Sequence, residues 1–273
     1  MCYNQDIMKR FILTILALFA VLINTLIFTP AFGAQTFTQK ELTVVTQDGF
    51  TLKANLKFKK DKTIKDYPTV VLIHSLGYNS QWWGDLPSAL ADNGFAVLTI
   101  DLRGHGASVY NAKLNKVSWT SLTNSAYKKY PDDVIKVVQA VKDEYPKKTF
   151  FNNWAIIGSD LGASTGIIAA DKLKEKPRTI VMLSPVVQAR GLYTPVSIAQ
   201  LDNVDFLSIT GEYDLAALEA EKYLKKFAQG DFSTYTSASK SAGMVMLKND
   251  PNVKELILGW INKYLKPQPE ITD

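Results

Sequence analysis

Two acidic side chains stand in glycine-containing segments of a kind that can hold a reacting group. Asp160 lies in the middle of residues 158–162 (GSDLG), and Asp214 ends the run GEYD. A carboxylate can act as a nucleophile or an acid, and this chemistry needs a base, most often histidine. The chain has two histidines, His74 and His105, and both precede Asp160. The sequence therefore offers few candidates for a general base.

The elements that must position these residues alternate between strand and helix patterns. Continuous apolar runs are typical of strands buried on both faces, and they occupy residues 69–73, 96–100, 154–157, 179–183 and 206–210. Helical stripes lie at residues 131–141 and 253–264. A hairpin is predicted where Asp48-Gly49 separates residues 41–45 from residues 52–58. This alternation predicts an α/β fold, with a mostly parallel sheet flanked by helices.

Four segments that follow predicted strands resemble motifs of the α/β-hydrolase superfamily. Residues 73–77 (IHSLG) look like its oxyanion loop, and residues 101–108 (DLRGHGAS) match its D-x-R-G-H-G-x-S segment. Residues 158–162 stand at the nucleophile elbow, and residues 211–214 resemble the segment that supplies the acid. The likeness, greatest to bacterial exported dienelactone-hydrolase-like and esterase-like proteins, runs from about residue 40 to residue 266.

The resemblance implies an α/β-hydrolase fold and a place for each part of a site. The connection between residues 183 and 204 is too short for a separate lid domain. The backbone N–H groups of Leu76 and Leu161 would form the oxyanion hole. Glycines at 158 and 162 would leave room for the sharp turn between a strand and a helix.

Two residues depart from the superfamily pattern. Asp160 stands where most members have serine, and Ala242, within residues 239–247 (SKSAGMVML), falls on the histidine of the A-x-H-G-T-x-M-L loop. Asp214 keeps the acid position. An elbow aspartate is the nucleophile of haloalkane dehalogenases and epoxide hydrolases, but that chemistry also needs a histidine. No histidine follows His105, so the triad is predicted to lack its base.

Substitute bases and nucleophiles are poor in this sequence. His74 and His105 are expected to support loops, although His74 comes close to the site. Lys240 is a base only if it is desolvated. Ser159 is expected to point away from the site. Among the remaining candidates, Ser75 and Ser241 are interpreted as loop hydroxyls, while Trp82 and Trp83 are expected to pack on the sheet, with pocket lining as the alternative.

Without a base, the Asp160 carboxylate is expected to accept the N–H groups of the oxyanion hole. Asp214 would face the same space. Two carboxylates there suggest a raised pKa on one of them or a captured cation or water, but ordinary solvation of Asp214 is the preferred interpretation. Two aspartates make a poor metal site, and no cofactor is expected.

Two functional hypotheses follow. The first is a degenerate hydrolase with a binding or structural role toward an unknown small molecule or protein. The second is an active hydrolase of small ester-like substrates that uses an unorthodox nucleophile or base. A nucleic-acid partner is not expected, because the net charge of +5 is spread along the chain rather than clustered.

The N-terminus has the pattern of an export signal. Lys9-Arg10 precede the apolar residues 11–28, and small residues follow at 31–34. Residues 1–34 are interpreted as a signal peptide or as an uncleaved membrane anchor through residues 11–28. Either reading predicts an exported protein, periplasmic, secreted or anchored. Residues 35–273 would form the α/β-hydrolase-like domain.

Overall fold

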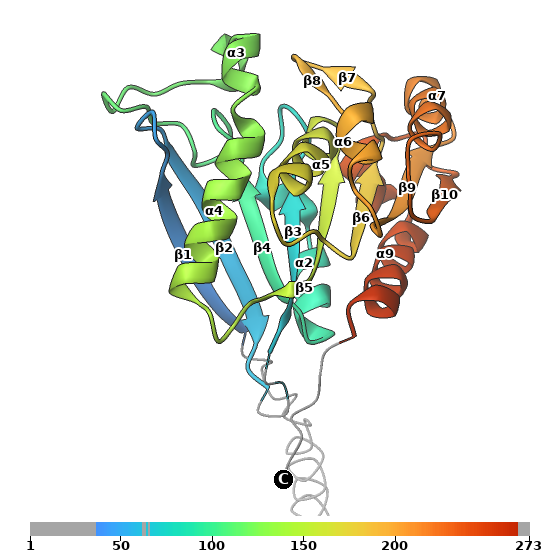
Figure 1. The fold of residues 1–273 in the computed structure, drawn as a ribbon, viewed down its shortest axis with the longest axis horizontal. Helices are drawn as coiled ribbons and strands as arrows, with labels where there is room; N and C mark the ends of the chain where they lie inside the picture. The colour runs from blue at the N-terminus through green and yellow to red at the C-terminus, as the bar shows by residue number, and fades with distance from the viewer. Residues whose placement is uncertain (1–36, 62–63, 65, 267–273) are drawn as a thin grey trace, which may run out of the picture. The chain divides into compact units, whose positions relative to one another are not determined.

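The computed structural model describes residues 37–61, 64 and 66–266, and a twisted sheet runs through their centre (Figure 1). Eight strands form it in the order β1-β2-β4-β3-β5-β6-β9-β10. Their bounds are β1 Phe37–Val45, β2 Thr51–Lys59, β3 Pro68–Ile73, β4 Ala96–Asp101, β5 Phe150–Ser159, β6 Thr179–Leu183, β9 Asp205–Gly211 and β10 Phe232–Ser237. All neighbouring pairs from β4 to β10 are parallel. Strand β2 pairs antiparallel with both β1 and β4. The predicted mostly parallel sheet is confirmed.

Helices cover both faces of this sheet, as Figure 1 shows for α4 and α5 on one face and α2 and α9 on the other. The α-helices are α2 Leu86–Asp92, α3 Asn124–Tyr127, α4 Tyr130–Glu144, α5 Leu161–Lys172, α6 Pro195–Ala199, α7 Leu215–Leu224, α8 Met246–Asn249 and α9 Pro251–Tyr264. Short 3-10 helices are η1 Ser80–Trp83, η2 Trp119–Ser121 and η3 Gly243–Val245. The two faces carry separate hydrophobic clusters.

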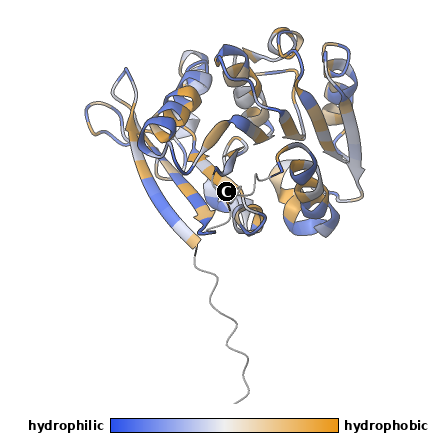
Figure 2. Ribbon diagram, turned by 60° about the horizontal axis from the view of Figure 1, so that its bottom comes forward, coloured by the Kyte–Doolittle hydropathy of each residue, from blue (hydrophilic) through white to orange (hydrophobic). Residues whose placement is uncertain are grey.

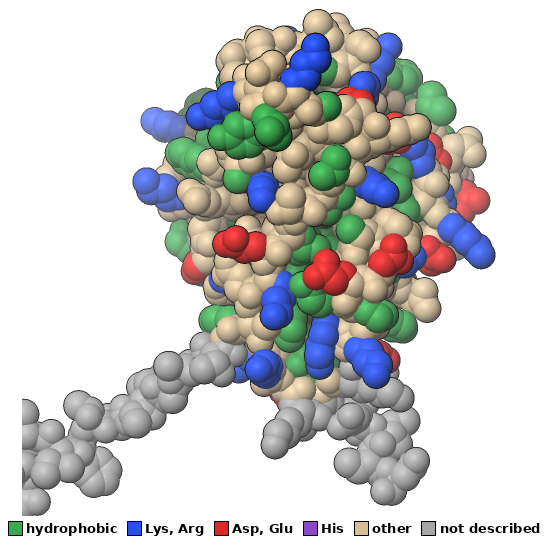
Figure 3. All heavy atoms as spheres, turned by 90° about the vertical axis from the view of Figure 1, so that its left-hand side faces the viewer, with side chains coloured by type: hydrophobic (Ala, Val, Ile, Leu, Met, Phe, Trp, Pro, Cys, Tyr) green, Lys and Arg blue, Asp and Glu red, His purple; other side chains and the backbone are tan. Residues whose placement is uncertain are grey.

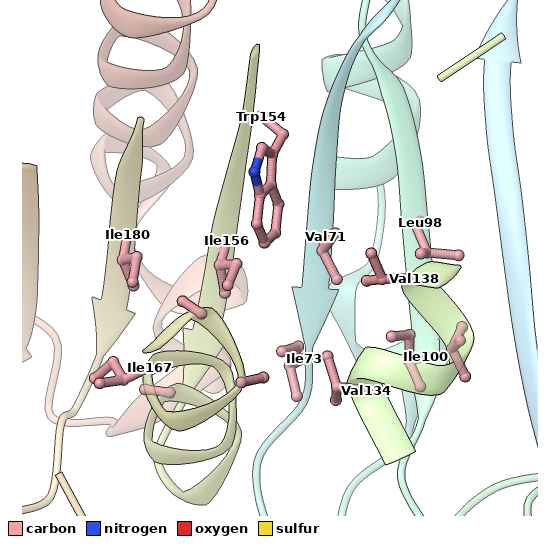
Figure 4. Close-up of a cluster of buried hydrophobic side chains, with 14 of the residues drawn as sticks. Val71, Ile73, Leu98, Ile100, Val134, Val138, Trp154, Ile156, Ile167 and Ile180 are labelled. Atoms are coloured by element: carbon pink, nitrogen blue, oxygen red, sulfur yellow. The ribbon is translucent and has the colours of Figure 1, made fainter. Parts of the chain in front are cut away.

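Helix α4 shows why the predicted stripe forms a helix in this place. Val134, Val137, Val138 and Val141 recur at helical spacing and are all buried. In Figure 4, Val134 and Val138 lie against strand residues that include Val71, Ile73, Leu98 and Ile100. Figure 2 accordingly shows helices with both hydrophobic and hydrophilic positions. Burial of such side chains, each contributing about 1.5–3 kcal/mol, fixes the helix on the sheet.

Three elements were not predicted from the sequence, because they are short or contain few apolar residues. Strand β10 (FSTYTS) is an edge strand whose middle residues are mostly exposed, while α2 and α7 have seven and ten residues. The connection after β6 contains only α6 and a two-stranded ribbon, β7 Gln188–Ala189 with β8 Leu192–Tyr193. The expected absence of a separate lid domain therefore agrees with the described fold.

The predicted export segment, residues 1–34 with the apolar run 11–28, lies outside the described residues. Among the described helices, none has the length and apolar character to cross a membrane. Figure 3 shows acidic and basic side chains interspersed on the face that carries β1.

A buried arginine ties three parts of the fold together. The Arg103 guanidinium, after β4, donates to both carboxylate oxygens of Asp133 on α4 at 2.8 and 2.7 Å. It also donates to Asp48 at the β1–β2 turn, at 2.6 and 3.0 Å. Such bidentate contacts fix the orientation of the guanidinium group as well as compensating its charge. The D-x-R-G-H-G-x-S segment is thus anchored to the hairpin and to α4.

Candidate functional site

The ends of the central parallel strands bring the candidate residues to one edge of the sheet. Ile73 at the end of β3 is in register with Gly158 of β5, and Ser159 is in register with Leu183 of β6. Strand β9 follows β6 and ends at Gly211. The segments that follow these strands therefore gather at the same edge, which contains the candidate site.

Asp160 occupies the apex of a strained turn between β5 and α5. Its backbone has φ 51° and ψ −120°, a region that side-chain-bearing residues rarely adopt. The flanking glycines permit the turn: a Cβ at Gly158 would lie 2.5 Å from the Ala163 Cα, and one at Gly162 would collide with the Ile73 carbonyl. The close approach of β5, α5 and β3 therefore excludes larger residues at both positions.

The Asp160 carboxyl group is half-buried and faces the N–H groups expected to form the oxyanion hole. Burial raises the pKa of this carboxyl group, while the backbone N–H groups of Leu161 and Leu76 lower it. The negative charge of Asp214 raises it further. The N–H groups expected to hold a substrate oxygen therefore lie close enough to the Asp160 carboxyl group to favour its charged form.

Asp214 lies at the start of α7, where its side chain accepts the Ala217 N–H at 3.2 Å. This is an ordinary helix-capping bond. Ala242 lies in extended backbone immediately before η3, and it is exposed. The structure thus brings Asp160 and Asp214 within electrostatic reach of each other, while position 242 offers no titratable group.

Three serine hydroxyls, which we call the serine clamp (Ser75, Ser159 and Ser184), hold the loop after Ala242. The hydroxyls of Ser75 and Ser159 are 2.6 Å apart, and the Met244 N–H donates to Ser159 Oγ at 2.8 Å. The Gly243 N–H donates to Ser184 Oγ at 2.7 Å. All three serines are buried at or just beyond the ends of β3, β5 and β6. Ser159 thus faces the loop rather than the apex of the elbow.

Ser184 is the member of the clamp that sequence reasoning missed. It directly follows the apolar run of β6 and has φ 50°. A serine in that position carries no motif, and only its place at the common strand edge marks it. Gly243 is constrained by the same clamp, since its φ is +58° and a Cβ there would lie 2.8 Å from Ser159 Oγ.

His74 has both ring nitrogens engaged within the protein. Its Nδ1–H donates to the Ser75 carbonyl at 2.7 Å, and its Nε2 accepts the Leu102 N–H at 3.0 Å. The ring is fully buried, and burial lowers its pKa. This neutral imidazole joins the end of β3 to the end of β4.

His105 has a similar arrangement. Its Nε2 accepts the Gly77 N–H at 3.0 Å, and its Nδ1 lies 3.1 Å from the Arg103 carbonyl. The ring stacks on Trp119 with a centroid distance of 5.6 Å. Burial, followed by the neighbouring His74, lowers the pKa of His105 to about 4. Both histidines therefore position loops, and neither has a free nitrogen for proton transfer.

Lys240, the remaining alternative base, is exposed, with its ammonium 6.0 Å from the ring centroid of Tyr213. The desolvation that a lysine base requires is not provided there. Ser241 accepts a hydrogen bond from the Asn249 side chain at 2.5 Å. Within the described residues, no group of three or more histidine, cysteine or acidic side chains is arranged to hold a metal ion.

Acidification should destabilise the fold through His105. Its pKa is about 4 in the folded chain and 6.5 as the reference for the unfolded chain, so the unfolded chain binds more protons between these values. The free energy of unfolding should therefore fall by roughly 3 kcal/mol as the pH is lowered from about 6.5 to 4. Urea unfolding across this range should show a shallower pH dependence for His105→Asn than for the unsubstituted chain. Identical slopes would contradict the assignment.

Loss of the Ser159 hydroxyl should loosen the loop at residues 242–246. Ser159→Ala leaves the buried Met244 N–H without its acceptor, at a cost of about 1–3 kcal/mol. Hydrogen exchange of the Met244 amide should accelerate. Ser121→Ala, which removes an exposed hydroxyl, is the matched control. Unchanged exchange at Met244 in the Ser159 variant would show that the clamp does not hold the loop.

Comparison with solved structures shows the same fold in several esterases. An esterase of Pyrococcus furiosus matches with 17% identity and a TM-score of 0.64, covering 84% of this chain and 92% of the other. An acetyl xylan esterase from Paenibacillus sp. R4 matches with 13% identity and a TM-score of 0.69, covering 86% of each chain. A thermostable carboxyl esterase from Bacillus coagulans has 12% identity and a TM-score of 0.65, with 84% and 100% coverage.

A search of curated proteins gives no significant match. A hydrolase family described as serine aminopeptidase, S33 matches residues 65–223, which is more than half of the chain and includes the elbow and the acid segment. The match agrees with the strand order, the turn at Asp160 and the fold of the esterases. The chain belongs to the serine aminopeptidase S33 family of α/β-hydrolases.

Proposed function

We propose that this chain is a non-hydrolytic α/β-hydrolase with a binding role. The observation that carries the proposal is the aspartate at the strained apex of the elbow, whose carboxyl group lies near the backbone N–H groups of Leu76 and Leu161. An acyl-transfer enzyme reserves such donors for the oxyanion that forms during reaction. A resident carboxylate competes with that oxyanion for the same two donors.

The lack of a base supports the same conclusion. His74 and His105 use both ring nitrogens to hold loops, and position 242 is alanine. An ester formed on Asp160 would need an activated water to cleave it, and no side chain described here is arranged to remove that proton. The serine clamp and the two neutral histidines keep the edge of the sheet ordered, which suits binding as well as catalysis.

The alternative is a working hydrolase of small esters, and one observation favours it. The strained backbone of Asp160 is the geometry that presents a nucleophile, and such strain is concentrated at functional sites. In this alternative Asp160 attacks the substrate and an unorthodox base completes the reaction.

Turnover of short-chain nitrophenyl esters separates the two possibilities. We expect no turnover by the purified chain and no change on Asp160→Asn. The double change Asp160→Ser, Ala242→His should create measurable esterase activity by restoring nucleophile and base, whereas each single change should not. Turnover by the unsubstituted chain that is abolished by both Asp160→Asn and His74→Ala would overturn the proposal.

We also infer that the protein is exported. The support is the sequence of residues 1–34, in which a basic pair precedes an apolar run and small residues. Fractionation of producing cells should place the chain outside the cytoplasm, and Lys9→Glu with Arg10→Glu should reduce its export. Recovery of the unsubstituted chain in the cytoplasmic fraction would contradict this inference.

A further inference from the structure

Three buried polar atoms without hydrogen-bond partners come from the helix α7 and the strand β9 that it covers. They are Glu221 Oε2, Ser208 Oγ and Thr210 Oγ1, each in a residue that is at most 7% exposed. Among the described residues, Trp83 Nε1 is the only other buried side-chain nitrogen or oxygen in this state. Buried polar groups are normally paired, because an unpaired one loses the free energy of its bonds to water. Their concentration in one helix and its strand therefore sets this contact apart.

The pleat of β9 directs both hydroxyl groups toward α7. Successive side chains of a strand point to opposite faces of the sheet. Phe206 of β9 belongs to the same hydrophobic cluster as Leu224 of α7, whereas the residues that alternate with Phe206 belong to the cluster of the other face. Ser208 and Thr210 therefore share the face that α7 covers. Glu221 lies three residues before Leu224, on the same buried side of the helix.

The Glu221 carboxyl group enters this contact without a cation to pair with it. Lys225 and Lys222 act on it electrostatically from exposed positions on the same helix, and neither forms an ion pair with it within the described part of the chain. The residues of β9 that face it are uncharged, as are residues 186–188 on the opposite side of a groove along α7. Burial raises the pKa of Glu221, while the nearby Ser208 hydroxyl and the two lysines lower it by less. These surroundings favour the protonated carboxyl group.

Helix α7 is held on the sheet by little apolar surface besides this contact. Its other buried residues are Ala217, Ala220 and Leu224, and an alanine side chain contributes much less than a leucine. Segments with few buried apolar contacts are those that open locally. The helix begins directly after Asp214 and lines, together with residues 186–188, a groove of about 610 Å³. A movement of α7 therefore changes the surroundings of Asp214 and the width of this groove.

We propose that Glu221 is a pH-dependent switch that holds α7 on β9 when its carboxyl group is protonated and releases the helix when it is ionised. A protonated carboxyl group both donates and accepts, so it can exchange hydrogen bonds with the hydroxyl groups of β9. On ionisation the proton passes to water, and the carboxylate regains hydration only when α7 moves off the strand. This inference goes beyond the proposed loss of hydrolysis and does not depend on Asp160, so each can fail without the other.

Hydrogen exchange of the amides of residues 218–224 in the full chain, corrected for the intrinsic effect of pH on exchange, tests the switch. Opening that is linked to one proton should become up to about tenfold more favourable per pH unit above 4.5, and should level off once Glu221 is ionised in the closed state. Glu221→Gln keeps the size of the side chain without its charge, so the corrected exchange should no longer depend on pH. Glu219→Gln, which changes an exposed glutamate of the same helix, is the matched control and should keep the dependence.

Carbon-13 NMR of the glutamate carboxyl groups gives a second measurement, which needs no folded variant. The pKa of Glu221 should lie above its ordinary value of 4.5, and Ser208→Ala should raise it further by removing a group that favours the charged form. Equal pH dependence of exchange in the unsubstituted and Glu221→Gln chains would overturn the proposal. So would a Glu221 carboxyl group that titrates at or below pH 4.5. Ester turnover measured on the same preparation reports separately on the proposed function.

Discussion

The backbone of Asp160 is held at φ 51° and ψ −120° where β5 turns into α5, and the close packing around this turn constrains the whole edge of the sheet. Gly162 lies so near the end of β3 that only hydrogen fits in place of a side chain. The same approach brings the N–H of Leu76, just beyond β3, to the Asp160 carboxyl group. One steric requirement thus determines how closely the start of α5 approaches the end of β3, and with it the surroundings of a carboxylate.

The turn is supported by side chains that hold backbone groups in place. His74 links the ends of β3 and β4, His105 holds Gly77, and Arg103 anchors the intervening segment to α4 and to the β1–β2 turn. Each of these groups acts on backbone or on a buried charge, and none needs a substrate. Under the proposed binding role, this support would persist without cleavage of a substrate, since fold and reaction are determined by different residues.

The parts of the fold that were predictable are those with long apolar patterns. The buried strands were predictable from continuous apolar runs such as residues 69–73, because both of their faces are buried. Helix α4 was predictable from the valines between 134 and 141, because burial of one helix face gives apolar residues a helical spacing. Strand β10 and helix α7 have weak periods, since an edge strand and a short helix bury few side chains. Pairing with β9 and packing on the sheet define them instead.

The site divides in the same way. Asp160, Asp214 and Ala242 were located by motifs, as were the loops of His74 and His105. The partner of each imidazole nitrogen was not, because a hydrogen bond to a distant backbone group leaves no local pattern. The role of Ser184 could not be predicted for the same reason, since it depends on which loop meets the end of β6. The spacing of motifs in the sequence located the candidate residues, whereas the contacts in the fold show which groups each of them binds.

The position of Phe37 has a practical consequence for handling the protein. This first described residue begins β1 and pairs with Lys59, at the edge where β4 and β3 begin. Asp160 follows the far end of β5, which runs parallel to β3 (Figure 1). A fusion partner or solid support attached through Phe37 therefore leaves the elbow open to solution. Immobilised in this orientation, the domain can be exposed to a flowing mixture of molecules with its candidate binding edge facing the stream.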